Sequence, residues 1–398
     1  MALTLDGTSG IVSSGAISSS SNITATGSIT TQSSTGIIFS DSSNQGAAAS
    51  PFSLKNRIIN GDMVIDQRNA GASVTIPATS VTYTVDRWFS YASQASKFTV
   101  QQNAGSVTTP AGFTKYLGVT SSSAYSVGAG DLFVVSQRVE GLNVADLAWG
   151  TASAATVTLS FWVRSSLTGT FGGSLKNSAG DRSYPFSYTI SAANTWEKKS
   201  ITIAGDTSGT WLTTNGIGID LNFGLGNGST FSGTAGSWQA ANLVSATGAV
   251  SVVGTNGATW YITGVQLEIG TSATPFERRL YNQELANCYR YFYKLGGPFN
   301  DGASCFMHYG IGWWYATTLA FVVTTFPVTM RGTPSFSVTN PTNFYVNTNG
   351  AVSAITVDQL SRQTCDWYAT GPTSTLNSAT RVYGINGTVN SVQFDAEL

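Results

Sequence analysis

Charged side chains are scarce in this sequence. Of its 398 residues only 10% are Asp, Glu, Lys or Arg, and the formal net charge is −1, whereas charged residues make up about a quarter of an ordinary soluble domain. Proteins that bind a phosphate backbone or an anionic membrane surface need a strong positive field. We therefore expect no nucleic-acid partner.

Long apolar stretches are also missing. No run approaches the roughly 18 apolar residues of a membrane-spanning helix. The first ten residues, MALTLDGTSG, lack the basic and apolar parts of a secretory signal. We expect no membrane insertion and no export by a standard signal.

Cysteine and histidine are rare. The three cysteines, Cys288, Cys305 and Cys365, are far apart in sequence, without the close pairs of a zinc or redox motif. We expect buried thiols made in a reducing compartment. The single histidine, His308, would have to serve any Ser-His-Asp or Cys-His site, and on a strand it faces away from Cys305. The sequence therefore favours neither a nucleophilic active site nor a zinc site.

Glycine and aromatic residues are abundant instead. The chain has 43 glycines, and 12% of its residues are aromatic, which is typical of strands joined by tight turns. Between 56 and about 270, β-branched or aromatic runs alternate with turn signals, which predicts an all-β protein with a jelly-roll β-sandwich. In one run, Leu159, Phe161 and Val163 share the face expected to meet the core. The runs are TYTVDRWFSY (82–91), LFVVSQRV (132–139), ATVTLSFWVRS (155–165), YPFSYTI (184–190), WEKKSITIAG (196–205), IGIDLNFGLG (217–226) and TWYITGVQLEIG (259–270).

Residues 1–54 form a different region. They are rich in Ser, Thr and Gly. Short segments such as GIVSSGAI and GIIF recur, in which apolar and polar residues roughly alternate. Pieces this small cannot bury a core alone, so the segment is either disordered or intertwined between identical chains that share an apolar face. The regular placement of Ile, Val and Phe favours the intertwined β segment.

The chain changes character again near residue 274. Thr274, Pro275 and Glu277 form a capping box with proline at the first helical position, which predicts that a helix begins there. The heptad-like spacing of its apolar residues suits packing against symmetry mates or a neighbouring domain. The aromatic, alternating segment YRYFYKL predicts a switch to strand near 289. The apolar seam consists of Tyr281, Leu285, Cys288 and Phe292.

Strand-like runs resume beyond the glycines at 296 and 297 and predict a second β domain. These runs are TTLAFVVTTF, SFSVTN, FYVNT and VQFDAEL. The predicted divisions are an N-terminal segment (1–54), a jelly-roll domain (55–273), a short helix with a connecting strand (274–295) and a C-terminal β-sandwich head (296–398).

Several stretches together resemble a known family. In order along residues 56–295, they are similar to the central domain of bacteriophage tail fibre and receptor-binding proteins. FPVTMRGTPSF (326–336) and FDAEL (394–398) resemble the distal tip domain of the same proteins. The central stretches are NRIINGDMVIDQRNAG (56–71), VDRW (85–88), SFWVRSS, TWEKKSITI, YITGVQLEIGTSATPFERR and ELANCYRYF.

The resemblance implies a homotrimeric fibre. Its N-terminal segment would attach to other tail or baseplate proteins, its jelly roll would be similar to carbohydrate-binding modules, and its head would face the host. The protein would then be a virion tail fibre, made in the host cytoplasm and released by lysis. Its expected partner is a bacterial surface polysaccharide.

The charges in NRIINGDMVIDQRNAG invite a chemical interpretation. On a strand, Asp62 and Asp66 lie about 13 Å apart, beyond the roughly 5–9.5 Å of a glycosidase pair. A calcium site made by Asn60, Asp62 and Asp86 is the better chemical hypothesis, because sugar-binding sandwiches often hold calcium with oxygen ligands. The alternative is that these groups satisfy turn amides or pair with nearby arginines.

The aromatic residues are the strongest candidates for ligand contact. Sugars bind by laying C–H faces on Trp and Tyr rings while polar groups bond the hydroxyls. For each candidate, core packing is the alternative, and Trp88 and Trp162 are expected to be core or sheet-packing residues. The candidates are Trp313, Trp314, Tyr315, Asp366, Trp367 and Tyr368 in the head, expected beside turns, and Trp211 and Trp238 in the jelly roll.

These observations favour a non-enzymatic adsorption protein with no predicted catalytic residue. Two alternatives stay open. One is a depolymerase that cuts the glycan and would need a carboxylate pair in a groove. The other is a structural spacer in which all the aromatic residues are core.

Overall fold

The computed structural model describes residues 37–38, 44–45, 55–296, 307–346, 350–371, 373–384 and 391–398. The chain divides into two units, residues 1–53 and 54–398. In the first unit the described part is an antiparallel pair of short strands, β1 (Ile37–Ile38) and β2 (Asn44–Gln45). The rest of the predicted intertwined segment lies outside the described residues.

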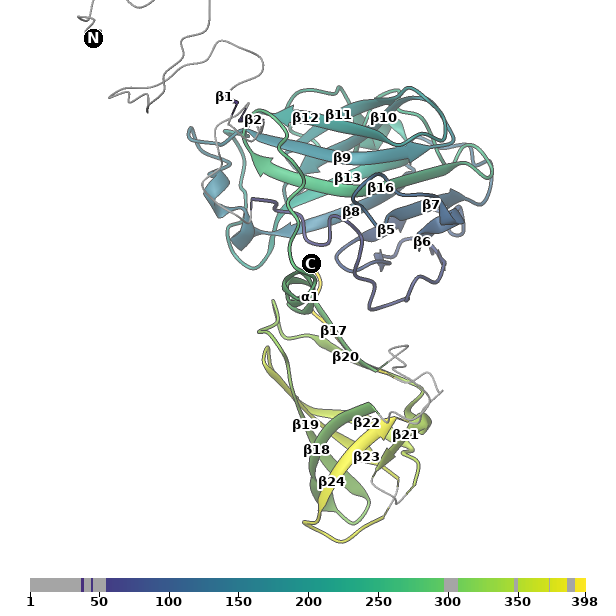
Figure 1. Ribbon diagram of the computed structural model, residues 1–398, viewed down its shortest axis with the longest axis vertical. Helices are drawn as coiled ribbons and strands as arrows, with labels where there is room; N and C mark the ends of the chain where they lie inside the picture. Colours follow the sequence, from purple (N-terminus) through teal and green to yellow (C-terminus); the bar gives the residue numbers. More distant parts are fainter. Residues whose placement is uncertain are drawn as a thin grey trace, which may run out of the picture. The chain divides into compact units, whose positions relative to one another are not determined.

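Two six-stranded antiparallel sheets form a sandwich in the second unit (Figure 1). One sheet has the order β11-β10-β13-β8-β5-β4 and the other β12-β9-β16-β7-β6-β3. The chain passes repeatedly from one sheet to the other, as in the predicted jelly roll. The strands are β3 (Val74–Thr75), β4 (Thr82–Tyr83), β5 (Phe89–Ala92), β6 (Phe98–Gln102), β7 (Leu117–Ser121), β8 (Leu132–Glu140), β9 (Val157–Ser165), β10 (Gly169–Lys176), β11 (Ser183–Ile190), β12 (Glu197–Ile203), β13 (Ile217–Asn227) and β16 (Thr259–Ile269), with the short parallel pair β14 (Ser232–Gly233) and β15 (Ser245–Ala246).

The core of the sandwich follows the predicted alternation. Leu159, Phe161 and Val163 on β9 are fully buried. The ring of Phe161 lies 5.1 Å from that of Phe223 on β13, in the opposite sheet. As expected for a core residue, Trp88 is also fully buried.

Residues 56–71 do not form the strand that the sequence predicted. Asn60 and Met63 have φ of 55° and 61°, a left-handed conformation that interrupts a strand. The Asn60 side chain accepts a hydrogen bond from the Ile65 amide and donates to the carbonyls of Ile65 and Asp86. Such local side-chain bonds compete with strand pairing. Ile59, Met63 and Ile65 are nevertheless buried.

The run predicted as one strand at 82–91 is divided by a turn. β4 and β5 flank residues 84–88, where the Trp88 amide donates to the Val85 carbonyl. Arg87 has φ of 71°, so the backbone reverses at this point and the two strands pair with each other.

The helix begins later than predicted. Helix α1 spans Tyr281–Tyr289, whereas the capping box placed its start near 275. The Thr274 hydroxyl donates to Glu268 at 2.6 Å, and Glu277 accepts a hydrogen bond from the Asn56 amide at 2.8 Å. The side chains predicted to cap the helix therefore form hydrogen bonds with residues of the sandwich instead.

The end of α1 agrees with the prediction. The helix ends at Tyr289 and is followed by strand β17 (Phe292–Gly296). Of the predicted seam, Cys288 packs with Ile59 and Ile65 of the sandwich, and Leu285 lies against them. The seam thus faces a neighbouring part of the same chain, although Tyr281 is 55% exposed.

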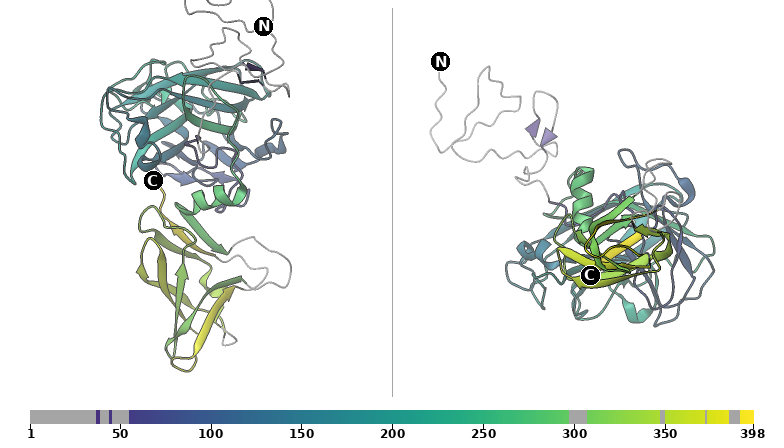
Figure 2. Two further views of the ribbon diagram at one scale, coloured as in Figure 1. Left: turned by 60° about the vertical axis from the view of Figure 1, so that its left-hand side comes forward. Right: turned by 90° about the horizontal axis from the view of Figure 1, so that it is seen from below.

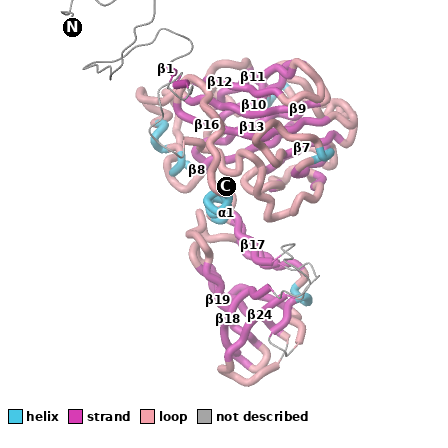
Figure 3. The backbone as a smooth tube through the Cα atoms, in the orientation of Figure 1, coloured by secondary structure: helices cyan, strands magenta, loops and turns pink. Residues whose placement is uncertain are grey.

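The head consists of two further antiparallel sheets, drawn as magenta strands in Figure 3. A six-stranded sheet has the order β21-β24-β18-β19-β23-β22, and a three-stranded sheet the order β17-β25-β20. Both contribute to one hydrophobic core, which includes Trp314, Trp367 and Phe394. The strands are β18 (Met307–Ala316), β19 (Leu319–Thr325), β20 (Ser335–Thr339), β21 (Phe344–Val346), β22 (Ala354–Leu360), β23 (Thr364–Thr370), β24 (Ala379–Gly384) and β25 (Ser391–Asp395).

Helix is rare throughout the described residues, as Figure 2 also shows from two further sides. Besides α1, those residues contain single-turn 3-10 segments. Within the same residues no helix is long and apolar enough to span a bilayer. The 3-10 segments are Ala104–Ser106, Gly141–Asn143, Ala145–Leu147, Ser229–Phe231 and Pro341–Asn343.

Candidate functional site

One face of the six-stranded head sheet carries exposed aromatic rings. Successive residues of a strand point to opposite faces, and on β18 this separates Trp313 and Tyr315 from Trp314. Trp313 is 42% and Tyr315 59% exposed, whereas Trp314 is fully buried. These residues lie near the end of β18, just before the turn at 317–318, which agrees with their predicted place beside a turn.

Neighbouring strands extend this row of rings. Trp313 pairs in register with Phe321 on β19, and Phe321 with Tyr368 on β23. The ring centroids are 4.5 Å apart for Trp313 and Phe321, and 5.3 Å apart for Phe321 and Tyr368. Tyr315 lies 5.7 Å from Tyr368. We call these four residues, Trp313, Tyr315, Phe321 and Tyr368, the aromatic face.

Polar groups border the aromatic face. Asp366 is half-buried on β23, two residues before Tyr368. Desolvation raises the pKa of Tyr368, and the carboxylate of Asp358 on β22, which is hydrogen-bonded to the phenol, raises it further. The phenol therefore stays protonated at neutral pH and can donate a hydrogen bond. This border offers both a donor and acceptors beside the rings.

Two predicted contact residues of the head are core residues instead. Trp314 and Trp367 are both fully buried. The Trp367 indole N–H donates to the Thr324 hydroxyl at 3.0 Å, which satisfies its polar atom inside the core. Neither side chain is available to a ligand in this conformation, which contradicts their predicted role.

The jelly-roll candidates, Trp211 and Trp238, lie together in a second aromatic group. Their rings are 5.4 Å apart and nearly perpendicular, and each also meets the edge or face of Trp149. Their indole N–H groups donate to the carbonyls of Ser208 and Ala204. We call Trp149, Tyr184, Trp211 and Trp238 the tryptophan cluster. Its bonds support a packing role, and sugar contact there stays a prediction.

The residues of the calcium hypothesis do not suit a calcium ion. The Asn60 side chain is used by its own loop, as described above. The Asp86 carboxylate accepts hydrogen bonds from the Gln67 amide and side chain and lies 3.7 Å from Arg68. These donors occupy the oxygens that a hard cation would need. In the part of the chain that the structure describes, no group of three His, Cys, Asp or Glu residues could hold a metal.

Three acidic side chains beside α1, those of Asp62, Glu277 and Glu284, help to line a small groove of about 140 Å³. Burial, and then repulsion from Glu284, raise the pKa of Asp62 in this groove. Glu284 accepts hydrogen bonds from the Arg279 guanidinium, at 3.0 Å, and from the Asn60 amide. Because the Arg279 guanidinium occupies the Glu284 carboxylate, Asp62 and Glu284 do not form a free pair like that of a glycosidase.

The sequence did not identify Phe321 as part of the aromatic face or Asp358 as part of its border. Both lie in strands, and strand alternation alone does not show which residue of one strand meets which residue of another. Pairing Trp313 with Phe321 would have required the register of the β18–β19 hairpin.

No family model and no curated protein matches the chain. Among solved structures, the enzymatically active domain of tailspike protein 4 of bacteriophage CBA120 matches with a TM-score of 0.29 and 13% identity. That match covers 54% of this chain and 22% of the tailspike chain.

Carbohydrate-binding modules are also among the structural neighbours. The family 11 module from Clostridium thermocellum, in complex with a mixed-linked tetrasaccharide, has a TM-score of 0.25 and 12% identity, and the match covers 51% of this chain and 98% of the module. A family 61 module bound to β-1,4-galactotriose has a TM-score of 0.24 and 11% identity, covering 46% and 88%.

Proposed function

We propose that the protein is a bacteriophage tail fibre or receptor-binding protein that binds a bacterial surface glycan through the aromatic face. The observation that carries this proposal is the contiguous row of four rings on an exposed strand face, two of them 42% and 59% exposed. The resemblance of the sequence to tail fibre proteins supports it.

The chemistry of the aromatic face suits a sugar. Rings lying in a row present π surfaces to the C–H faces of successive sugar units. The carboxylates of Asp358 and Asp366 at the border can accept hydrogen bonds from hydroxyls. An exposed apolar patch bordered by polar groups is also a typical recognition surface.

The fibre would be a homotrimer attached to the tail or baseplate through residues 1–54, as the resemblance implies. Three copies would present three aromatic faces, and linked sites raise the avidity well above the affinity of each. A single face can therefore bind weakly and still retain the virion on a cell.

We propose that binding occurs without cleavage. Of the carboxylates that line the groove beside α1, Glu284 pairs with Arg279 and Glu277 accepts a hydrogen bond from the Asn56 amide. The competing depolymerase would release new reducing ends from the bound polysaccharide. An assay for reducing ends on a polysaccharide that the protein binds separates the two proposals, since release would contradict a pure binding role.

The test of the proposal uses the full chain and the double variant Trp313→Ala/Tyr315→Ala. Fluorescently labelled protein is applied to a bacterial glycan array and to cells of strains that the wild type labels. We expect the double variant to lose tenfold or more in binding, because removal of central aromatic contacts typically costs more than about 1 kcal/mol each. Tyr281→Ala, which removes an exposed ring on α1, is the matched control.

Two outcomes would contradict the proposal. If the double variant binds as well as the wild type, the aromatic face is not the binding surface. If the wild type labels no strain and no glycan while its trimer is intact, the spacer alternative is favoured. Thermal unfolding of both variants shows whether lost binding reflects lost folding.

A further inference from the structure

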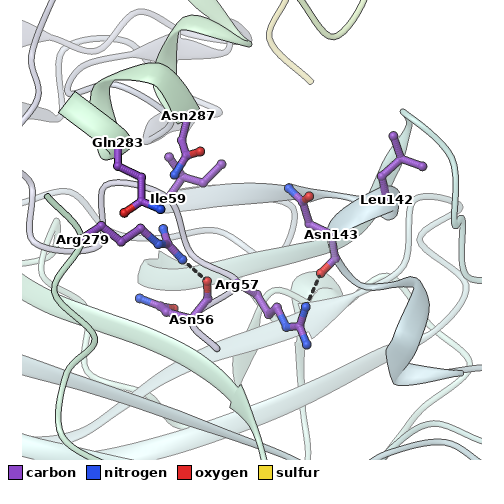
Figure 4. A pocket seen from close by; sticks show the side chains of 8 residues that line it. All are labelled: Asn56, Arg57, Ile59, Leu142, Asn143, Arg279, Gln283 and Asn287. Atoms are coloured by element: carbon purple, nitrogen blue, oxygen red, sulfur yellow. Dashed lines mark hydrogen bonds between the residues drawn. The ribbon is translucent and has the colours of Figure 1, made fainter. Parts of the chain in front are cut away.

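A second concave site lies where the sandwich meets α1. It is a pocket of about 270 Å³, which we call the neck pocket (Figure 4). Gln283 and Asn287 of α1 line one side, and Leu142 and Asn143, from the turn after β8, line the other. The described residues that line it are Asn56, Arg57, Ile59, Leu142, Asn143, Arg279, Gln283 and Asn287.

Among the described residues that line the neck pocket there are two arginines and no acid. Arg57 donates to the Asn143 carbonyl at 3.1 Å and to Asp146 at 2.6 Å. Asp146 lies outside the lining, and its side chain is 54% exposed. Ion pairs of this exposed kind contribute little, so a carboxylate from a ligand can replace Asp146 at Arg57.

Arg279 is less available than Arg57. Its side chain is 9% exposed and forms an ion pair with Glu284 at 3.0 Å. Its guanidinium also donates to the carbonyls of Asn56 and Ile58. Arg279 therefore fixes the wall of the pocket, and Arg57 is the group that can exchange its partner.

Amide side chains supply the rest of the polar lining. Gln283 is exposed, and Asn287 and Asn143 are half-buried. Each amide both donates and accepts hydrogen bonds, which suits hydroxyl groups. Leu142, which is 56% exposed, gives an apolar edge. A small number of polar groups that converge in a concave, partly apolar site is typical of small-ligand binding.

We infer that the neck pocket binds one carboxylate-bearing sugar unit, with its carboxylate on Arg57 and its hydroxyls on the amides of Asn143, Gln283 and Asn287. The inference rests on the proposed glycan-binding function and adds a site with different chemistry. The aromatic face would hold C–H surfaces, whereas the neck pocket, whose described lining residues include no aromatic side chain, would select for a charge and for the positions of hydroxyl groups.

The test measures binding of sodium glucuronate to the purified full chain by ligand-observed NMR, with glucose as the neutral probe. We expect glucuronate to bind and glucose to bind at least about tenfold more weakly, because a hydrogen-bonded charge contributes more than a neutral group. Arg57→Gln should weaken glucuronate binding about tenfold and Gln283→Ala by a few-fold. Arg164→Gln, at an arginine outside the pocket, should have no effect.

Asp146→Asn gives the sharpest result. It removes the carboxylate that competes for Arg57, so glucuronate should bind about threefold more tightly. A residue with a merely structural role would not produce tighter binding. Equal binding of glucose and glucuronate, or an Asp146→Asn variant that binds glucuronate no more tightly than the wild type, would overturn the inference.

The neck pocket and the aromatic face can fail separately. Trp313→Ala/Tyr315→Ala should leave glucuronate binding intact while it reduces cell binding. If the pocket variants do not change glucuronate binding but cell binding still depends on the aromatic face, the inference fails and the proposed function stands. If cell binding is unaffected by the aromatic variants, the proposed function fails whatever glucuronate does.

Discussion

The tryptophan cluster of the sandwich and the aromatic face of the head each contain four aromatic residues but use them differently. In the cluster, Trp149 and Tyr184 are 7% and 9% exposed, and three indole N–H groups donate to loop carbonyls. On the face, Trp313 and Tyr315 stand on a strand with much of each ring in solvent. Ring content alone therefore does not identify a binding surface. What separates the two groups is whether the rings lie between loops or on an open strand face.

The largest expected effect comes from removing a ring of the tryptophan cluster. Trp149→Ala should lower the free energy of unfolding by about 3–5 kcal/mol. The ring lies 4.7 Å from Trp211 and 5.3 Å from Trp238, and its N–H bonds the Ala155 carbonyl. Urea unfolding followed by circular dichroism measures the change. Trp313→Ala is the matched variant, and equal losses of stability in the two would remove the distinction between cluster and face.

Unlike the aromatic face, the sandwich also buries an acidic side chain. Asp86 is 1% exposed. Burial, against the attraction of Arg68 and hydrogen bonds from Gln67, raises its pKa from 3.8 to about 6. The folded protein therefore binds a proton more tightly than the unfolded chain does. This contribution to stability is present below pH 4 and is lost as the pH rises through 6.

Comparison with Asp86→Asn isolates this effect. The unfolding free energy of the wild type, relative to that of the variant, should fall by about 2–3 kcal/mol between pH 4 and pH 7, since each unit of pKa shift corresponds to about 1.4 kcal/mol. Urea titrations at several pH values measure it. A difference that is constant with pH would show that Arg68 and Gln67 offset burial, and a difference that rises with pH would show that they outweigh it.

The contrast between cluster and face also shows what the sequence could predict. The alternation in ATVTLSFWVRS predicted β9 and its buried residues, because strand period and apolar pattern are local properties. The sequence predicted a strand for residues 56–71. They form an irregular loop instead, although their apolar residues are buried. Their left-handed residues, Asn60 and Met63, are stabilised by contacts that no local pattern reveals.

The candidate site was predicted in part for the same reason. The sequence named Trp313, Trp314 and Tyr315 alike as candidates for ligand contact. In the structure Trp313 and Tyr315 are exposed and Trp314 is buried, a difference that strand alternation would have predicted once β18 was assigned. The neck pocket depends on contacts between residues far apart in sequence, such as Arg57 with Asp146. Its position follows from the fold as a whole.

A smaller effect is expected from the exposed ring of the aromatic face. Trp313→Ala should change the free energy of unfolding by less than about 1 kcal/mol, since substitutions at exposed positions cost little. Its binding to the glycan that the wild type recognises should fall about tenfold, because a stacking surface is lost. Trp313→Phe keeps an aromatic plane and should retain part of the binding. Array titrations measure affinity, and a full loss with phenylalanine would show that stacking is not the interaction.

The smallest effect concerns the border of the aromatic face. Tyr368→Phe keeps the ring against Phe321 and Tyr315 but removes the hydroxyl that bonds Asp358. Stability should be nearly unchanged, because the hydroxyl is close to solvent and water can replace its bond. Affinity should fall two- to fivefold if the hydroxyl or the positioned carboxylate bonds the sugar, since one hydrogen bond contributes about 0.5–1 kcal/mol. Asp358→Asn tests the same contact from its other side. Equal affinities for both variants and the wild type would show that the rings alone hold the ligand, and the polar border would then have no part in recognition.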